Sequence, residues 1–245
     1  MSLYVISDLH LSINEKTNKS MEVFGPAWQD YTERIRKYWN AVVTNDDTVI
    51  IPGDVSWALK LEDSLDDFKF IESLPGRKII GKGNHDFWWS TLSKINRFFS
   101  ENDIKSVEIL YNNAYRIEDF IVCGTRGWFN DEKQQNVVGD VDFEKIVARE
   151  TARLEISLEA AKVLQEESPS LPILVFLHFP PVWSGFECRP ILDLLHKYNV
   201  KKCYFGHIHG NYFVKKCTEF EGIDFILTSA DYLKFVPMPI FAEEY

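Results

Sequence analysis

Short apolar runs that end in glycine or polar residues are the feature that most limits how this chain of 245 residues can fold. One such run is Leu3–Ser7, which leads directly into Asp8, and another is Thr48–Ile51, which leads into Pro52 and Gly53. Apolar runs of this length between turn residues are typical of buried strands. Longer stretches with helical apolar spacing alternate with them, so the sequence predicts an α/β architecture.

The order of the predicted elements favours one domain with two sheets. Further strands are predicted at 78–80, 114–117, 120–123, 173–177, 203–205, 212–217 and 223–227. Helices are predicted at about 27–43, 62–74, 90–99, 141–166 and 187–198. Since no repeat and no linker rich in proline, glycine or serine separates these elements, we expect residues 1–245 to form a single domain. We expect two sheets that pack face to face, with the helices outside.

The charge of the chain argues against a large nucleic-acid interface. There are 27 basic and 37 acidic side chains, which give a net charge of −10. A protein with this balance lacks the broad basic surface on which nucleic-acid binding depends, so we do not expect nucleic acid as a partner. A small phosphorylated substrate is compatible with the acidic charge, because bound divalent ions would place positive charge at the site itself.

Cysteine usage and the first residues indicate a cytoplasmic protein without a membrane span. None of the four cysteines forms a C-x-x-C pair, which favours reduced thiols in a core over disulfides. The chain enters the apolar run at Leu3 without a basic segment or a long apolar stretch before it. Neither a signal peptide nor a transmembrane helix has this pattern, so we expect a cytoplasmic location.

Residues with metal-binding side chains follow five of the predicted strands. In open α/β folds, ligands bind at the carboxyl ends of the strands, so these loops are expected to converge. Five of the six histidines lie in them, whereas His196 lies in a predicted helix and is given no role. The five runs are Asp8-Leu9-His10, Gly53-Asp54, Gly83-Asn84-His85-Asp86, His178 and Gly206-His207-Ile208-His209.

These side chains suit divalent metal ions. Carboxylate oxygen and imidazole nitrogen bind hard or borderline cations. Two ions about 3.5–4 Å apart can share a carboxylate and activate a water molecule for in-line displacement. The glycines beside the donors allow the backbone to turn tightly. We therefore predict seven ligands, namely Asp8, His10, Asp54, Asn84, His178, His207 and His209.

Each of these residues has a simpler interpretation when it is taken alone. Asp8 or Asp54 would be a turn residue after a strand, and His10 or His178 would be a hydrogen-bonded core histidine. The joint pattern reverses this preference. Burying several histidines and acids near strand ends without a metal would carry a large desolvation cost.

The five runs, in this order, resemble those of the calcineurin-like metallophosphoesterase family. The resemblance extends from residue 8 to residue 209, and each run follows a strand-like segment. It implies a four-layer αββα sandwich, in which two mixed sheets lie between flanking helices. It also implies two divalent ions bridged by Asp54, one held by Asp8, His10 and His209 and the other by Asn84, His178 and His207.

The resemblance further implies a reaction and two catalytic residues. The implied reaction is direct attack on phosphorus by a hydroxide that bridges the two metals, without a phospho-enzyme. His85 would protonate the leaving group or steady the transition state, and Asp86 would orient it. Asp86 has an alternative interpretation as a cap or turn residue beside the following helix. Manganese is the expected activating metal, with iron or zinc as alternatives.

Several functions are open within this resemblance. Protein phosphatases of the superfamily usually carry arginine just after the second motif and glutamate at the end of the third, whereas this chain has Val55 and Asp86. The pattern is closer to small bacterial-type phosphodiesterases and phosphatases. A catalytically silent scaffold that binds other proteins is one alternative, but no ligand is missing. A nuclease of the family is another, and the acidic charge weighs against it.

Aromatic residues cluster beside the motifs. Trp57 and Trp128 are the two that we expect to face the cleft, while ordinary core packing accounts for the others. Arg126 follows the strand predicted at 120–123, and it is expected either to bind a phosphate or to form a surface salt bridge.

Overall fold

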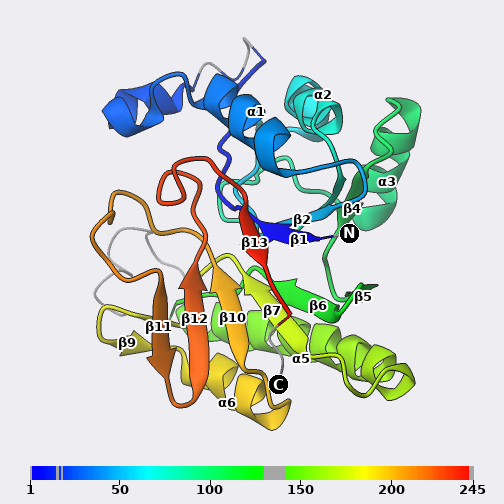
Figure 1. Cartoon of the computed structure of the whole chain (residues 1–245), viewed down its shortest axis with the longest axis vertical. Coiled ribbons are helices and arrows are strands. Elements are labelled where there is room, and N and C mark those ends of the chain that lie inside the picture. The colour runs from blue at the N-terminus through cyan, green and yellow to red at the C-terminus, as the bar shows by residue number, and fades with distance from the viewer. Residues whose placement is uncertain (1, 15–16, 18, 130–141, 243–245) are drawn as a thin grey trace.

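Five strands form the first of two large sheets in the computed structural model, which describes residues 2–14, 17, 19–129 and 142–242 (Figure 1). The strand order is β13-β1-β2-β3-β4. Strands β1 to β4 are parallel, and β13 pairs with β1 in the antiparallel direction. The strands are β1 (Leu3–Val5), β2 (Thr48–Ile51), β3 (Arg77–Ile80), β4 (Val107–Ile109) and β13 (Met238–Ile240).

The second sheet has six strands in the order β11-β12-β10-β7-β6-β5. Its four central strands are parallel, and β11 and β5 pair antiparallel at the two edges. A separate hairpin joins β8 (Val182–Trp183) to β9 (Phe186–Glu187). The sheet strands are β5 (Ala114–Ile117), β6 (Phe120–Thr125), β7 (Ile173–Leu177), β10 (Lys202–Phe205), β11 (Cys217–Phe220) and β12 (Ile223–Leu227).

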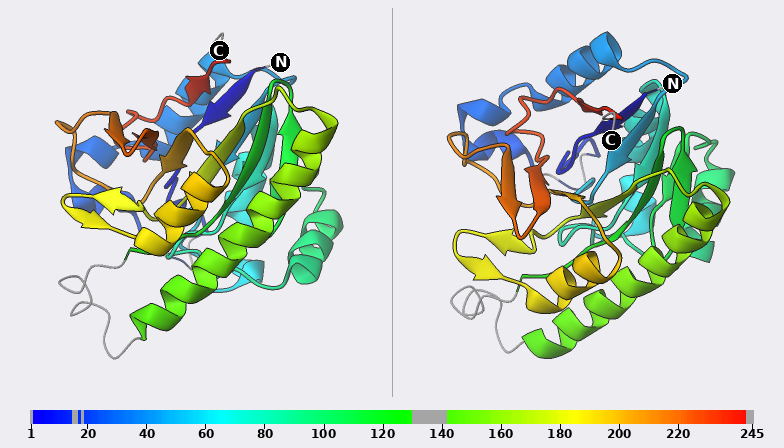
Figure 2. Two further views of the ribbon diagram at one scale, coloured as in Figure 1. Left: turned by 90° about the horizontal axis from the view of Figure 1, so that it is seen from below. Right: turned by 60° about the horizontal axis from the view of Figure 1, so that its bottom comes forward.

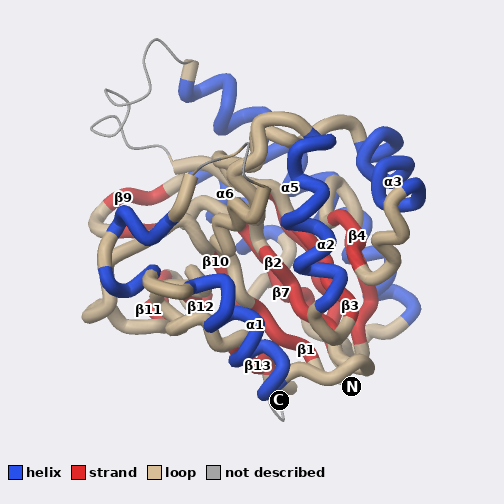
Figure 3. Tube along the Cα trace, turned by 90° about the horizontal axis from the view of Figure 1, so that it is seen from above, coloured by secondary structure: helices blue, strands red, loops and turns tan. Residues whose placement is uncertain are grey.

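Helices cover the outer face of each sheet. Figure 3 shows α1 and α2 on the outer side of the first sheet, and Figure 2 shows α5 and α6 on the outer side of the second. The α-helices are α1 (Tyr31–Val42), α2 (Leu65–Ser73), α3 (Leu92–Glu101), α5 (Phe143–Glu167) and α6 (Arg189–Lys197). Among the described residues, the short 3-10 helices are η1 (Met21–Phe24), η2 (Pro26–Trp28) and η3 (Leu61–Ser64).

Alternate residues of the central strands pack on opposite faces, which explains why the strands are apolar throughout. In β2, Ile50 packs between the sheets, whereas Val49 and Ile51 pack toward the helices. In β7, Leu174 and Phe176 likewise lie between the sheets. Strands buried on both faces have continuous apolar runs rather than alternating ones. The predicted four-layer sandwich of two mixed sheets between helices is confirmed.

Two predicted elements differ from the structure. The helix expected at 27–43 begins only at Tyr31, because Asp30 has a left-handed backbone with φ of 51° that interrupts the helical path. The strand expected at 212–217 is wrong. The strand begins at Cys217, where it can pair with Ile226 of β12.

Two helix starts also differ in detail. The N-cap of α3 is Thr91 rather than Ser90, and its side chain accepts a hydrogen bond from the backbone N–H of Lys94. The predicted start of the long helix at residue 141 lies outside the described residues, and α5 begins at Phe143. In the part of the chain that the structure describes, no helix is both long enough and apolar enough to cross a membrane.

Candidate metal centre

All seven predicted ligands lie just beyond the carboxyl ends of parallel strands, and both sheets contribute. The first sheet supplies the residues after β1, β2 and β3, and the second supplies those after β7 and β10. Their side chains meet where the ends of the two sheets adjoin. The residues from the first sheet are Asp8, His10, Asp54 and Asn84, and those from the second sheet are His178, His207 and His209.

The backbone at four of these residues has a left-handed conformation. The φ angles of Asp8, His10, Asp54 and His207 are 59°, 47°, 52° and 69°. Residues other than glycine rarely adopt such angles, and each costs on the order of 1–3 kcal/mol. The turns are held by backbone hydrogen bonds, which include Asp8 N to Gly53 O at 3.0 Å and His10 N to Asp54 O at 2.9 Å.

Two glycines make room for the carboxylates. A Cβ atom on Gly83 would collide with the Asp54 carboxylate, and a Cβ atom on Gly206 would collide with that of Asp8. Only glycine therefore fits at these positions. These two glycines therefore let the backbone come close to the carboxylates of the two acids.

Four side chains gather around the first position. The Nε2 atoms of His10 and His209 are 3.2 Å apart. His209 Nε2 is 3.4 Å from Asp8 Oδ1, and His10 Nε2 is 4.0 Å from the same oxygen. Asp54 Oδ2 lies 3.7 Å from His10 Nε2. Two nitrogens and two carboxylates thus point at a common space.

A second group of donors lies on the other side of Asp54. His178 Nε2 is 2.7 Å from Asn84 Oδ1, and His207 Nδ1 is 3.0 Å from that oxygen. His178 Nε2 is also 3.4 Å from Asp54 Oδ2. The same Asp54 oxygen that faces His10 therefore faces this second group. Asp54 is placed between the two groups, as a bridging ligand would be.

The orientation of His178 indicates that its donor nitrogen lacks a proton. His178 Nδ1 lies 3.2 Å from the carbonyl oxygen of Pro52, which can only accept a hydrogen bond. In the neutral ring, Nε2 then carries a lone pair and faces the accepting oxygen of Asn84. Two acceptors at this distance repel each other unless a cation lies between them, so this pair fits a metal ion.

His209 is held in the same way at the first position. Its Nδ1 lies 2.9 Å from Asp231 Oδ1 and donates there, while its Nε2 faces Asp8. Although burial opposes it, the hydrogen bonds to Asp231 and Asp8 raise the pKa of His209 to about 10, so Nε2 carries a proton that a bound cation would displace. Carboxylate partners of this kind fix the tautomer of metal-binding histidines. Asp231 also accepts a hydrogen bond of 3.1 Å from the backbone N–H of Gly210.

Burial shifts the pKa values of the acids and imidazoles at the site. Burial, together with the nearby Asp8 and Asp86, raises the pKa of Asp54 well above its usual range. Burial alone would raise the pKa of Asp8 too, but the surrounding imidazoles, chiefly His209, lower it. Burial lowers the pKa of His178 to about 3, so its ring is neutral. In this structure the protonated His209 supplies positive charge beside Asp8. Divalent cations would supply such charge to both buried carboxylates.

His85 lies beside the donor groups. Its backbone N–H donates to Asp54 Oδ1 at 2.7 Å, while its ring centroid is 5.6 Å from that of His10. The ring lies against Trp57, with centroids 4.2 Å apart. Burial, and then the charge of Lys19, lowers the pKa of His85 to about 4. This ring is adjacent to the ligands and available for contact with a bound group.

Asp86 contacts the backbone of two site loops rather than the imidazole of His85. Its carboxylate is buried and accepts five hydrogen bonds of 2.7 to 3.3 Å. Among the described residues, no hydrogen bond joins it to the His85 ring. The predicted orienting contact is therefore replaced by one that ties the loop after β2 to the loop after β3. The donors are the backbone N–H groups of Asp54, Val55, Ser56 and Gly83 and the indole N–H of Trp88.

Sequence reasoning missed Asp231 and Lys19. Asp231 follows β12, so the rule that polar residues after strands converge could have found it. Lys19 lies in an irregular segment, and its Nζ is 3.3 Å from the centroid of the Trp57 ring. No strand-like apolar run leads into it in the sequence, and only the folded chain brings it to the site.

The structure gives different results for the predictions made about Trp57, Trp128 and Arg126. Trp57 stacks on His10, with ring centroids 4.8 Å apart. Trp128 instead packs in the core, 4.6 Å from the ring of Phe179. Arg126 forms an ion pair with Glu150 at 3.1 Å, and the Glu150 side chain is fully buried. Arg126 thus follows the salt-bridge alternative, but in a buried rather than a surface setting.

Two mixed sheets whose adjoining strand ends gather carboxylate, carboxamide and imidazole donors define an α/β protein built to bind metal. The family model described as calcineurin-like phosphoesterase matches residues 1–211, and the chain belongs to this family. Membership supports metal-dependent phosphoester hydrolysis in general terms. A comparison with curated proteins found no match.

Solved structures share the fold at low sequence identity. Phosphopantetheinyl hydrolase from Mycobacterium tuberculosis is 14% identical, with a TM-score of 0.56 and coverage of 99% of this chain and 96% of the other. Protein TT1561 of Thermus thermophilus is 13% identical, with a TM-score of 0.53 and coverage of 94% and 89%. At such identities, the likeness concerns the fold alone.

Proposed function

We propose that this chain is a phosphoester hydrolase that works with two divalent cations. The observation that carries the proposal is the pair of donor groups on either side of Asp54, whose Oδ2 atom is 3.7 Å from His10 Nε2 and 3.4 Å from His178 Nε2. Asp8, His10 and His209 would hold one cation, and Asn84, His178 and His207 the other. When bound, two such ions polarise the phosphoryl group and lower the pKa of water.

His85 is proposed to donate a proton to the leaving group. Its ring lies beside His10 and against Trp57, outside the two donor groups. An anionic phosphoester next to the ring would raise the pKa of His85 from its low value, because an opposite charge favours the imidazolium. The proton would then pass from a ring nitrogen to the leaving oxygen.

Asp86 and Asp231 are proposed to be positioning residues. Asp86 holds the loops that carry Asp54 and Asn84 through its hydrogen bonds to their backbone. Asp231 keeps a proton on His209 Nδ1 and so leaves Nε2 free to bind a cation. Both keep donors in place before substrate arrives, which reduces the reorganisation that the reaction requires.

Manganese is the proposed activating ion. Mixed oxygen and nitrogen donors suit manganese, iron or zinc, and cellular supply decides among them. Dialysis of the metal-free protein against each ion, followed by metal analysis and an activity assay, tests the choice. Higher turnover with zinc or iron than with manganese at equal occupancy would contradict it.

The direct test of function uses two aryl phosphoesters. Hydrolysis of mono- and bis-(4-nitrophenyl) phosphate is measured with manganese, before and after chelation. We expect turnover of at least one ester, its loss with the chelator, and its return when manganese is added. Asp54→Asn is the matched variant, expected to lose activity and at least one metal. If the unaltered protein is folded and fully loaded with metal but hydrolyses neither ester, the result would instead favour a catalytically silent scaffold.

A further inference from the structure

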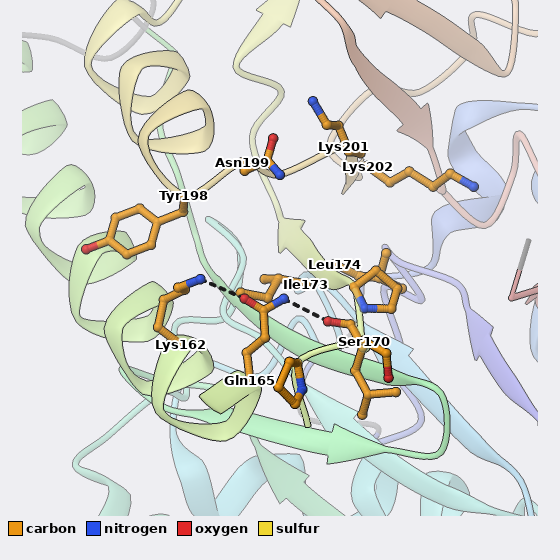
Figure 4. Close-up of a pocket in the computed structure, with 12 residues that line it drawn as sticks. Lys162, Gln165, Ser170, Ile173, Leu174, Tyr198, Asn199, Lys201 and Lys202 are labelled. Carbon is orange, nitrogen blue, oxygen red and sulfur yellow. Dashed lines mark hydrogen bonds between the residues drawn. The ribbon is translucent and has the colours of Figure 1, made fainter. Parts of the chain in front are cut away.

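A cavity of about 340 Å³ opens directly onto the proposed site. Three of the site's imidazoles, those of His10, His85 and His209, form one side of it. The cavity therefore continues the metal centre. This continuity sets it apart from the cavity in Figure 4, which lies beside Leu174 and Lys202, at the opposite ends of β7 and β10.

The other side of the cavity is apolar and largely aromatic. It is formed by residues of η1 and η2, by Trp57, and by the loop after His209. Phe24 and Tyr212 stand at the rim, and 63% and 44% of their surfaces are exposed. Large aromatic side chains gain little from being left in water, so their placement at the mouth of a site points to a ligand that covers them.

Two buried tryptophans form the base of the cavity and are fixed to the imidazoles. Trp57 stacks on His10, with an interplanar angle of 20°. Trp28 meets His209 edge to face, with centroids 5.6 Å apart. Because both indoles touch proposed ligands, a group that enters the cavity would lie close to the proposed metal centre.

The aromatic base offers contact area with few hydrogen-bonding groups. The indole N–H of Trp57 points to the sulfur of Met21 at 3.3 Å and is satisfied within the wall. Lys19 Nζ lies over the face of the Trp57 ring, 3.3 Å from its centroid, and brings one positive charge to the cavity. An apolar surface with a cation beside it suits a flat apolar group attached to an anion.

We propose that this cavity receives the leaving group of the substrate and prefers a planar aromatic group to a small aliphatic one. The proposal rests on the proposed hydrolase function, since the wall residue His85 is the proposed proton donor to that group. The exposed aromatic rings at the rim offer contact to a planar group, and the scarcity of polar atoms disfavours readout of individual hydrogen-bonding groups. The aromatic preference therefore comes chiefly from Phe24 and Tyr212, which are exposed, whereas Trp28 and Trp57 are buried beneath them.

The test measures binding of two phosphonates that the enzyme cannot hydrolyse. The manganese-loaded protein is titrated with naphthylmethylphosphonate and with methylphosphonate, and binding is measured by calorimetry and by tryptophan fluorescence. The naphthyl compound is expected to bind at least about tenfold more tightly, because it covers apolar surface that methylphosphonate leaves in water. Equal affinity for the two compounds in the unaltered protein would overturn the proposal.

Rim substitutions locate the preference. In Phe24→Ala/Tyr212→Ala the preference should fall to about threefold or less, with methylphosphonate affinity unchanged. Phe213→Ala is the matched control, because Phe213 is fully exposed in the same loop and does not line the cavity. Metal content and circular dichroism establish that each variant is folded. A full naphthyl preference in the double variant would refute the assignment of the rim.

Failure of the cavity proposal and failure of the hydrolase proposal give different results. If neither nitrophenyl ester is hydrolysed while the naphthyl preference persists, the enzyme assignment fails and the aromatic subsite stands. If the esters are hydrolysed and both phosphonates bind equally, the hydrolase stands and the aromatic subsite fails.

Discussion

Single residues at the site combine backbone strain with buried charge. Asp8 and Asp54 have positive φ angles, and both side chains are buried within reach of the same imidazoles. Neither feature favours folding by itself, since strain and desolvation both cost free energy. Their coincidence at these two strand ends is expected where stability is given up for cation binding.

At the residue scale, His85→Ala separates proton donation from metal binding. The variant should keep both metals, because the His85 ring lies outside the donor groups. Its turnover should fall by about 100-fold or more for esters with alkyl leaving groups, which need a proton, and less for nitrophenyl esters. Steady-state kinetics on both ester types checks this. His196→Ala, at an exposed helical histidine, is the control, and unchanged alkyl-ester turnover in His85→Ala would exclude the acid role.

Asp231→Asn tests whether Asp231 holds His209, a proposed metal ligand, in place. The substitution removes the charge that holds His209 Nδ1–H, so the donor nitrogen loses its fixed tautomer. Metal affinity should fall by about 10- to 100-fold, while the fold is kept. Competition with a fluorescent chelator measures the affinity. Asp224→Asn in β12 provides the comparison, and identical affinities in the two variants would contradict the positioning role of Asp231.

The seven proposed ligands could be placed together from the sequence at this scale, whereas their neighbours could not. Each ligand follows an apolar run, so strand prediction and donor chemistry suffice to place it. The role of Asp86 depends on which backbone amides approach its carboxylate across 30 or more residues, and no local pattern encodes this. Lys19 reaches Trp57 from an irregular segment, so its place depends on tertiary structure alone.

At the scale of elements, the central strands were predictable and the edges were less so. The central strands are buried on both faces and are apolar throughout. The edge strand β13, Met238–Ile240, has Pro239 at its centre and escapes recognition, although Met238 and Ile240 pack between the sheets. Aromatic residues at 212 and 213 suggested a strand, but they lie exposed beside the site. Exposed aromatic residues in a loop can thus give the same sequence pattern as a buried strand.

The loops after β2 and β3 must pack closely for the site to form, which Gly83→Ala tests. A methyl group at this position collides with the Asp54 carboxylate and should displace it, with loss of metal. Gly81→Ala is a close control, because its Cβ atom would lie no nearer than 3.6 Å to Pro52 Cα. Metal analysis of both purified variants decides the matter. Full occupancy in Gly83→Ala would show that the loops tolerate separation.

Helix α2 is tied to the loop after β1 by a buried acid with a shifted pKa. Asp67 Oδ1 accepts the backbone N–H of Ile13 at 2.8 Å, and Asp67 Oδ2 accepts the Ser56 hydroxyl. Burial raises the pKa of Asp67 from 3.8 to about 6. The folded state therefore holds a proton that the unfolded state releases. The stabilisation is complete below about pH 4, the usual value for the unfolded residue, and is lost as pH rises through 6.

Asp67→Asn should flatten this pH dependence. Relative to the unaltered protein, the variant should gain roughly 3 kcal/mol in free energy of unfolding between pH 4 and 7, because it has no proton to lose. Urea unfolding of the metal-free proteins at several pH values measures the difference. The exposed neighbour Asp66 supplies the control, Asp66→Asn. Parallel pH curves for unaltered protein and Asp67→Asn would rule out this linkage.

At the scale of the whole molecule, the proposed metal centre joins the two sheets. Asp8, Asp54 and Asn84 come from the first sheet, while His178 and His209 come from the second. The apolar layer between the sheets holds them together along their length, and the donors close one end of that contact. A cation held by both sheets binds the folded state and has no comparable site in the unfolded chain. Metal binding should therefore stabilise the entire fold.

Removal of the metals should accordingly lower the melting temperature. At a free manganese concentration about 100 times the dissociation constant, binding contributes about 2.7 kcal/mol per site, or roughly 5–10 °C in a chain of this size. Differential scanning calorimetry with manganese and with excess chelator measures the shift. Asp54→Asn, which lacks the carboxylate between the two donor groups, should show a smaller shift or none. If chelation left the unaltered protein's melting temperature in place, the cations would not be bridging the sheets, because a ligand shared by both must resist their separation.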